Sequence, residues 1–403
     1  MPGVAQAAML PTRTAAPQPM TRASRGTPRF LRWLQTVAVA VCVACGIALV
    51  TSLTIAYGQV ALAGRLNTSL ASAEQAAAKL NAVDIAATGW AADPSAANKS
   101  ALTSALHDLG PELAGLQTDG GPSSKDVVNG VLDYAMLVQT GLDASQPAAA
   151  VRQIVAAHEA LGKTVRPALS AFVGDAEQAR EVALSTRSTL LADIATGAAV
   201  LVLLLLGIAL ARRTRRLLNF GLALSVLLLI GSWLGVTAAA GAQPMRDAVA
   251  EATASDLPTV RAETALAMAS QNLTLALKDP SSTYAGDTEI RLNRAATLLA
   301  NVENATLNDQ IASLRRATRT VGAAVTKGDW TLAATSAKTS ASAYTKFEGT
   351  LTSVEGRLAT GPSTAASNAQ AWLLTAGVGA TLAALVAAAA AALGINQRLR
   401  EYR

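Results

Sequence analysis

Four stretches of this chain consist almost entirely of apolar residues, and they define its organisation. In order they are residues 33–57, 190–211, 217–240 and 371–395. A bilayer core about 30 Å thick needs about 20 apolar residues in a helix, and each stretch meets that length without a Lys, Arg or Glu. Because lipid cannot satisfy free backbone groups, each stretch is predicted to be a transmembrane helix. The only acid within them, Asp193, lies near one end.

The first apolar stretch has a second interpretation, a cleaved signal peptide. Ala61-Leu62-Ala63 resembles a small-residue cleavage site. The apolar run before it is far longer than the roughly 7–15 residues of a signal-peptide core, so an uncleaved anchor is the preferred interpretation.

The arginines beside the spans predict the orientation. Residues 1–32 hold five arginines and no acid, the loop 212–216 holds four arginines, and the tail 396–403 holds three arginines and one acid. By the positive-inside rule all three segments are cytoplasmic. They carry 12 of the 33 bases and one of the 27 acids, a net +11, which leaves −5 for the rest. The pI near 9.5 therefore reflects orientation, and no nucleic-acid partner is expected. The proline-rich segment 1–32 is expected to be disordered and to lie along anionic lipid.

Two stretches of similar size, 58–189 and 241–370, then lie outside the plasma membrane, each entered from one span and left by the next. A local match supports an internal repeat. Asp93-Pro94 lies 36 residues after Tyr57, and Asp279-Pro280 begins 37 residues after Ala242. Proline cannot continue a helix interior, so both motifs are predicted to be turns that end a first long helix.

Each outer stretch has apolar residues at helical spacing and almost no strand signal. Each is predicted to form four helices, an even number because entry and exit are both at the membrane. The predicted helices are 61–91, 95–116, 123–142 and 147–188, then 244–277, 288–302, 308–326 and 331–358. The predicted fold is an all-α membrane protein with four transmembrane helices and two tandem extracytoplasmic four-helix-bundle, sensor-like domains.

Catalytic chemistry has few candidate residues. There are two histidines, His107 and His158, and both are expected to be exposed on helices. The acids, including Glu263, alternate with bases along the helices and are expected to lie on solvated faces. Cys42 and Cys45 share one face of the first span, where burial in lipid argues against a redox pair or a metal site. We expect no enzyme, no cofactor and no metal site.

Arginines that face into a bundle could hold a small acidic ligand, since guanidinium groups suit carboxylates. Arg166 and Arg261 are the candidates. Transport is disfavoured because spans that conduct ions normally contain ionisable residues. About 260 residues lie outside and little but arginine-rich ends lies inside, which favours a sensor or adaptor whose output belongs to another protein.

The architecture resembles the actinobacterial GlnX-type membrane proteins, which are encoded beside a glutamine-binding-type lipoprotein and serine/threonine protein kinase G. The features that carry the resemblance are the four spans with tandem helical domains, the alanine-rich composition, the Arg-Arg-Thr-Arg-Arg loop at 212–216 and the ending at 394–403. The resemblance implies that the lipoprotein senses aspartate or glutamate-like amino acids outside, that this chain relays its state, and that the kinase adjusts nitrogen and carbon metabolism.

The leading hypothesis is therefore a transmembrane signalling adaptor with a solute-binding lipoprotein and a cytoplasmic kinase as partners. Two alternatives stay open: a chemoreceptor-like sensor that binds a small molecule directly, and a structural envelope scaffold. Association with further copies of the chain is also left open. The predicted cytoplasmic docking surface combines the loop and the tail, with Arg212, Arg213, Arg215, Arg216, Arg400, Glu401, Tyr402 and Arg403.

Overall fold

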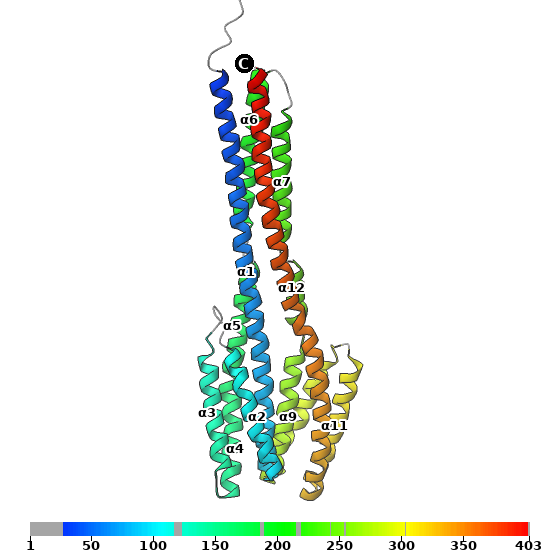
Figure 1. Ribbon diagram of the computed structural model, residues 1–403. Coiled ribbons are helices and arrows are strands. Elements are labelled where there is room, and N and C mark those ends of the chain that lie inside the picture. Colours follow the sequence, from blue (N-terminus) through cyan, green and yellow to red (C-terminus); the bar gives the residue numbers. More distant parts are fainter. Residues whose placement is uncertain are drawn as a thin grey trace, which may run out of the picture. The chain divides into compact units, whose positions relative to one another are not determined.

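The structure is a computed structural model that describes residues 27–116, 123–185, 189–214, 219–241, 243–253, 255–302 and 304–401, and every element in these ranges is a helix (Figure 1). The prediction of an all-helical chain is confirmed for these residues. The helices are α1 (Thr27–Ala92), α2 (Ala96–Gly115), α3 (Lys125–Leu142), α4 (Pro147–Ala160), η1 (Leu161–Val165), α5 (Arg166–Ser185), α6 (Leu190–Thr214), α7 (Phe220–Ala240), α8 (Gln243–Thr253), α9 (Leu257–Leu277), α10 (Thr283–Leu299), α11 (Ala305–Thr326) and α12 (Trp330–Glu401).

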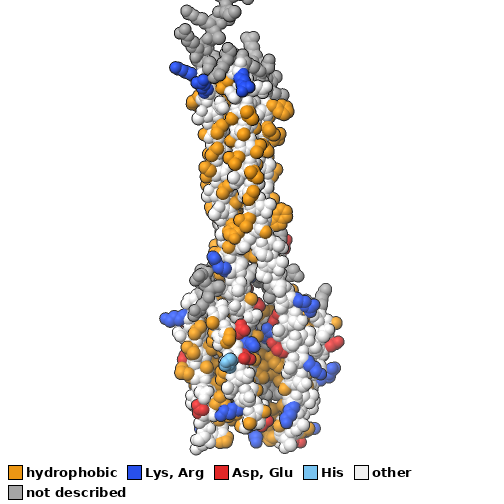
Figure 2. Space-filling model, in the orientation of Figure 1, with side chains coloured by type: hydrophobic (Ala, Val, Ile, Leu, Met, Phe, Trp, Pro, Cys, Tyr) orange, Lys and Arg blue, Asp and Glu red, His pale blue; other side chains and the backbone are white. Residues whose placement is uncertain are grey.

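Four helical stretches are long and apolar enough to cross a membrane, as predicted. They are Arg29–Ala92, Pro147–Arg212, Phe220–Ala250 and Trp330–Gln397. Helices α1, α6, α7 and α12 hold the described parts of the four apolar runs of the sequence. Figure 2 shows apolar side chains spread over these helices along a length with few charged groups. The composition and length of these helices fit a membrane protein.

The chain divides into two compact units. The first, here called the span unit, comprises Met1–Leu49, Ala192–Leu234 and Gly379–Arg403, and the second, the head unit, comprises Val50–Leu191 and Gly235–Val378. Helix α1 has 66 residues and α12 has 72, and each contributes residues to both units. No loop therefore separates the two parts of either helix.

Small residues allow close helix packing in the span unit. A Cβ added at Gly46 of α1 would lie 2.6 Å from Cβ of Ala384 in α12. A Cβ added at Gly221 of α7 would lie 2.8 Å from Cα of Gly394 in α12. Without a hydrophobic driving force between helices in lipid, such close backbone approach is a main source of packing energy.

Polar side chains of the span unit bond to neighbouring helices. Oγ of Ser225 in α7 donates to the backbone oxygen of Ala387 in α12 at 2.7 Å. Nε1 of Trp233 in α7 donates to Oδ1 of Asp193 in α6, also at 2.7 Å. The one acid that the sequence places within a span is thus hydrogen-bonded to a second span.

The head unit has two main apolar cores. The first is built from α1 to α5, with Tyr134, Ile154 and Leu161 fully buried, and it also receives Leu273 from α9. The second is built from α9 to α12, with residues such as Phe347 at its centre, and Ile85 of α1 packs against it. Each core therefore gains a residue from the other half of the chain.

Turn signals in the sequence coincide with several helix ends. Helix α1 ends directly before Asp93-Pro94, and Ser95 caps α2 by accepting the backbone N–H of Asn98 at 3.3 Å. Helix α9 ends before Lys278, which has a left-handed φ of 50°, and Oδ1 of Asp279 accepts the N–H of Ser281 at 2.8 Å in the turn that contains Pro280. Residues 117–122, between the predicted helices 95–116 and 123–142, lie outside the described residues.

The prediction of one helix over 244–277 is wrong. Helix α8 ends at Thr253 and α9 begins at Leu257. Pro258 is the second residue of α9, where its missing N–H is tolerated because the first turn has no acceptor for it. The same proline in the middle of a longer helix would break a hydrogen bond, so the chain ends one helix and starts another.

A single π-turn, η1, interrupts the helix that runs from Pro147 to Ser185. The backbone N–H of Arg166 bonds to the oxygen of Leu161, five residues earlier. Such a turn takes up one extra residue compared with an α-helix and is often found at functional sites.

Candidate functional site

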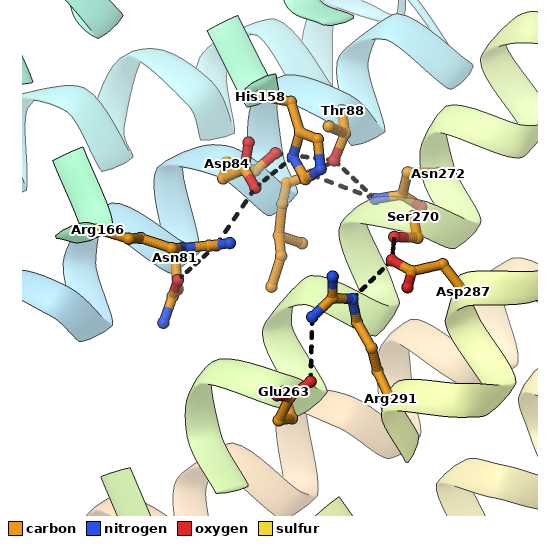
Figure 3. A network of polar contacts seen from close by, with 11 residues as sticks. Asn81, Asp84, Thr88, His158, Arg166, Glu263, Ser270, Asn272, Asp287 and Arg291 are labelled. Atoms are coloured by element: carbon orange, nitrogen blue, oxygen red, sulfur yellow. Dashed lines mark hydrogen bonds and ion pairs between the residues drawn. The ribbon is translucent and has the colours of Figure 1, made fainter. Parts of the chain in front are cut away.

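Asp84 of α1 organises a buried polar cluster in the head unit (Figure 3). Its side chain is 2% exposed, and its Oδ2 lies 2.9 Å from Nδ1 of His158 in α4 and 3.9 Å from Nη2 of Arg166 in α5. Nη2 of Arg166 also donates to Oδ1 of Asn81 at 3.1 Å. A buried carboxylate is costly without a cation, so Arg166 compensates the charge that α1 brings into the core.

The π-turn sets the register that makes this cluster. His158 and Arg166 are eight residues apart. At about 100° per residue, an uninterrupted α-helix would separate their directions by about 80°. Because η1 takes up one residue, the two directions come within about 20°, and both side chains reach Asp84.

Tyr134 of α3 is under the electrostatic influence of the same carboxylate. Its side chain is fully buried, and its hydroxyl has no hydrogen-bond partner among the described residues. Burial, and secondly the charge of Asp84, raise the pKa of Tyr134 well above its ordinary value. The hydroxyl is therefore neutral, and it adds no further negative charge to the cluster.

Contacts from the second half of the chain reach this cluster. Nδ2 of Asn272 in α9 donates to the backbone oxygen of Ile85 at 3.3 Å and to Oγ1 of Thr88 at 3.4 Å. The ring of Tyr284 in α10 meets the ring of His158 edge-on, with centroids 5.8 Å apart. Polar and aromatic contacts thus tie α1 and α4 to α9 and α10, as Figure 3 shows for Asn272.

A second cluster joins α9 to α10. Glu263 accepts from Arg291 at 3.1 Å and pairs with Arg294 at 3.1 Å through its other oxygen. Oδ2 of Asp287 accepts from Nε of Arg291 at 2.6 Å and from the hydroxyl of Ser270 at 3.0 Å. The two acids and two arginines balance, so this cluster is a closed network of ion pairs, of which Figure 3 shows the contacts of Arg291 with Glu263 and Asp287.

A third cluster surrounds Arg261 of α9. Nε of Arg261 lies 2.8 Å from Oε1 of Glu348, and Nη1 lies 2.6 Å from Oε2 of Glu355, both in α12. Nη2 donates to Oγ1 of Thr352 at 2.6 Å. Burial raises the pKa of Glu355 to about 7, although Arg261 opposes the shift, and burial also raises the pKa of Glu348 and of Glu74 in α1.

A cavity of about 410 Å³ lies between the first and third clusters. Its walls come from α1, η1, α5, α9 and α12, and it is lined by both Arg166 and Arg261. The volume is within the range of small-molecule sites. Figure 2 shows acidic and basic side chains close together around a recess on the head unit.

The two arginines predicted as ligand-binding residues thus lie on one cavity, although they are 95 residues apart in the sequence. Both also face the interior of the head unit, with side chains 25% and 10% exposed for Arg166 and Arg261. Each is already paired with a carboxylate of its own chain. Their positive charge is therefore largely compensated before any ligand binds.

The predicted cytoplasmic docking surface is described only in part. Arg212 in α6 and Arg400 in α12 are exposed. Arg213 and Glu401 lie in helices, but their side chains are outside the described part of the structure. Four further members lie outside the described residues altogether: Arg215, Arg216, Tyr402 and Arg403.

Two side chains that were predicted to be exposed to solvent are buried. His107 is exposed as expected, but His158 is buried, and so is Glu263. Asp84 was not singled out by the sequence. A signal for it exists, because Asp84 follows Leu80 by four residues on the apolar stripe of α1, and a polar residue on such a stripe is buried when the stripe is.

Among the described residues, no group of three or more His, Cys, Asp or Glu side chains is arranged to hold a metal ion. The arrangement seen in the head unit is instead one of ion pairs around a cavity. Comparison of this chain with protein-family models, with curated proteins and with solved structures finds no match.

Proposed function

We propose that this chain is a non-catalytic transmembrane signalling adaptor of the plasma membrane. In this proposal both termini are cytoplasmic, and two tandem four-helix bundles outside the cell read the state of an amino-acid-binding lipoprotein. The cytoplasmic loop and tail pass that state to a serine/threonine kinase, as in the GlnX-type proteins that the sequence resembles.

The observation that carries this proposal is the continuity of α1 and α12. Each helix contributes to both the span unit and the head unit without a loop between the two parts. A partner that favours one packing of the head unit shifts an equilibrium between conformations. Rigid helices then transmit a rotation, or a shift of about an ångström or two, over a longer distance than loops can.

The buried ion pairs support this role. Closed polar networks fix discrete arrangements, because a partly broken network leaves buried charges without partners. Contacts from Asn272 and Tyr284 tie the cluster around Asp84 to α9 and α10 in the second half of the chain, and the cluster around Glu263 joins α9 to α10. A partner that changed the packing of α1 against α9 would therefore shift the head unit from one defined state to another.

The first experiment tests the partners. The tagged full-length chain is purified from membranes, and co-purifying proteins are identified. We expect a solute-binding lipoprotein and a serine/threonine kinase. A variant without residues 400–403 keeps Arg398 and should still insert and bind the lipoprotein, while losing the kinase. Recovery of neither partner contradicts the adaptor role and leaves direct sensing of a small molecule or the envelope scaffold.

The second experiment tests helix continuity. Three glycines inserted after Gly361, in the interior of α12, should uncouple the change in cytoplasmic phosphorylation that follows addition of aspartate or glutamate, while lipoprotein binding is kept. The matched control carries the same insertion after Gly328, a turn residue with φ of 72°, and should signal normally. Unchanged signalling in the Gly361 variant would rule out α12 as the route.

Direct sensing of a small molecule is the second candidate function. The observation that favours it is the cavity lined by Arg166 and Arg261. It predicts that a ligand binds the purified chain without any lipoprotein, which the adaptor role does not require.

A further inference from the structure

The head-unit cavity continues into a smaller one. A second cavity, of about 70 Å³, shares four lining residues with it, among them Glu355, and reaches Asn67 of α1. The lining residues of α1 therefore run from Asn67 to Asn81, about 20 Å of helix at about 1.5 Å per residue. Together the two cavities suit an elongated ligand more than a compact one.

One wall of the larger cavity is apolar. It is formed by Leu80 of α1 together with Leu161, Val165, Leu169 and Val173 of η1 and α5. An apolar group that packs against this wall is removed from water, which is favourable. The ligand should therefore carry a hydrocarbon or aromatic portion.

The charged groups that line the two cavities compensate one another. Arg166 and Arg261 each pair with a carboxylate of the chain. Arg180 and Arg261 act electrostatically on Glu74, and Arg180 also acts on Glu177. A charged ligand would lose its hydration here without meeting an uncompensated charge of opposite sign, which is costly. The cavities therefore favour a neutral ligand.

Two residues that line the smaller cavity hold buried polar atoms with no hydrogen-bond partner among the described residues. Oδ1 of Asn67 accepts from Nη1 of Arg180 at 2.8 Å, but the donor Nδ2 of Asn67 has no partner. Oε2 of Glu355 lies 2.6 Å from Nη1 of Arg261, but the acceptor Oε1 of Glu355 has none. Because buried polar atoms are nearly always satisfied, one unpaired donor and one unpaired acceptor favour an occupant that both accepts and donates.

A hydroxyl or a primary carboxamide meets this requirement, because each is neutral and each both donates and accepts hydrogen bonds. A cavity of about 70 Å³ has room for such a group, since one water molecule needs roughly 10–15 Å³. The apolar wall includes Leu80, which lies farther along α1 than Asn67. The polar group and the apolar portion of the ligand can therefore occupy different cavities.

We propose that the two cavities together bind a neutral amphipathic molecule, an alcohol or a primary amide with an aromatic or hydrocarbon portion. Its polar group lies at Asn67 and Glu355, and its apolar portion packs against Leu80, Leu169 and their neighbours. This ligand replaces the acidic one expected from the two arginines. The inference rests on direct sensing, the second candidate function, for which it names the ligand class, and it does not require the adaptor role.

The test uses the full-length chain in nanodiscs of zwitterionic lipid, with empty nanodiscs as the blank for partition into lipid. Three probes of matched length are titrated by calorimetry: neutral 4-phenylbutanamide, the anion 4-phenylbutanoate and the cation 4-phenylbutylammonium. The titration is done at pH 8, where most Glu355 carboxylates are ionised because their pKa is about 7. We expect binding of the amide and much weaker binding of the two ions.

Asn67→Asp tests the placement of the polar group. It keeps an oxygen for Arg180 but replaces the unpaired donor by a second oxygen. Loss of one hydrogen bond predicts an affinity for the amide lower by about threefold to tenfold. Asn129→Asp is the matched control, because Asn129 is exposed and lines neither cavity, and it should bind the amide like the unmodified chain.

Ala262→Leu fills part of the larger cavity, which Ala262 lines, and should abolish binding, with helix content and melting temperature as checks on folding. Tighter binding of either ion than of the amide would overturn the neutral ligand class and leave direct sensing standing. Titrations that match empty nanodiscs for all three probes would overturn both, since the cavities then hold only solvent. Unchanged affinity for the amide in Asn67→Asp would also overturn the proposal.

Discussion

Replacement of Asp84 by asparagine should destabilise the head unit strongly. The substitution keeps the shape of the side chain but removes the charge that faces Arg166 and His158. Arg166 is then left as a mostly buried guanidinium, with a side chain 25% exposed, without its nearest carboxylate. Breaking a buried pair from one side typically costs about 3–5 kcal/mol.

The geometry gives a similar magnitude. Two unit charges 3.9 Å apart attract each other by about 4 kcal/mol at an effective dielectric constant of about 20. Asparagine keeps one acceptor for His158 or Arg166, so we expect the lower end of the range, about 3 kcal/mol. For a unit of this size, that corresponds to a melting temperature lower by about 6–12 °C.

The assay is thermal unfolding of the full-length chain in detergent, followed by circular dichroism. Asp108→Asn is the matched control, since it alters another His–Asp pair, with 3.8 Å between Nδ1 of His107 and Oδ1 of Asp108, whose side chains are 88% and 53% exposed. Exposed pairs contribute little, so the control should stay within about 2 °C. Arg166→Gln added to Asp84→Asn should restore part of the loss, because it removes the unpaired cation. Equal melting temperatures for Asp84→Asn and Asp108→Asn would refute the reasoning.

Three further predictions concern other parts of the chain. Burial raises the pKa of Glu355 to about 7, so the native state holds this proton more tightly than the unfolded state. Stability is therefore lost as pH rises from about 4.5 to about 7, by at most about 3 kcal/mol. Glu355→Gln should flatten the dependence of melting temperature on pH in that window, and an unchanged slope would contradict this prediction. Gly394→Val should destabilise the detergent-purified chain by about 1–3 kcal/mol, and so lower its melting temperature, because it overpacks α12 against α7. Gly231→Val should have little effect, because an added Cβ there meets nothing within 4 Å. Similar melting temperatures for the two variants would argue against the contact at Gly394. In a chain whose two native cysteines are replaced by alanine, a cysteine at Gly328 should react with an impermeant reagent in intact cells and one at Thr214 should not, and labelling at Thr214 would overturn the predicted topology.

Helix positions could largely be predicted from the sequence, because their signals are local. A run of apolar residues long enough to span lipid needs no partner to be recognised. Asp93-Pro94 and Asp279-Pro280 each follow the end of a long helix directly or within two residues, since a proline excludes helix continuation whatever surrounds it. The break before Leu257 was missed because Pro258 is compatible with both the interior of a kinked helix and the first turn of a new one.

The polar clusters could not be predicted in the same way, because they depend on contacts between distant segments. Asp84 and His158 are 74 residues apart, and a lone histidine on an alanine-rich helix carries no sign of a partner. Arg166 and Arg261 were singled out as inward-facing bases, yet the acids that compensate them follow only from the packing of α1, α9 and α12. Once those partners are known, the charge of each arginine is seen to be compensated within the chain.

The π-turn has a consequence for how this protein can vary. Deleting one residue of η1, for example Gly162, whose Cα has open space around it, would let the segment from Pro147 to Ser185 close into a regular helix with every backbone bond made. Helix content would hardly change, and the residues after the deletion would keep nearly the same direction relative to those before it, because η1 already absorbs one residue more than a regular helix does. His158 and Arg166 would then be seven residues apart in a regular helix, still within about 20° of each other, and both would still face Asp84. A related chain that lacks this one residue should therefore keep the acid at position 84 and the arginine at position 166 but lack the π-turn, so that the length of this segment and the π-turn are inherited together.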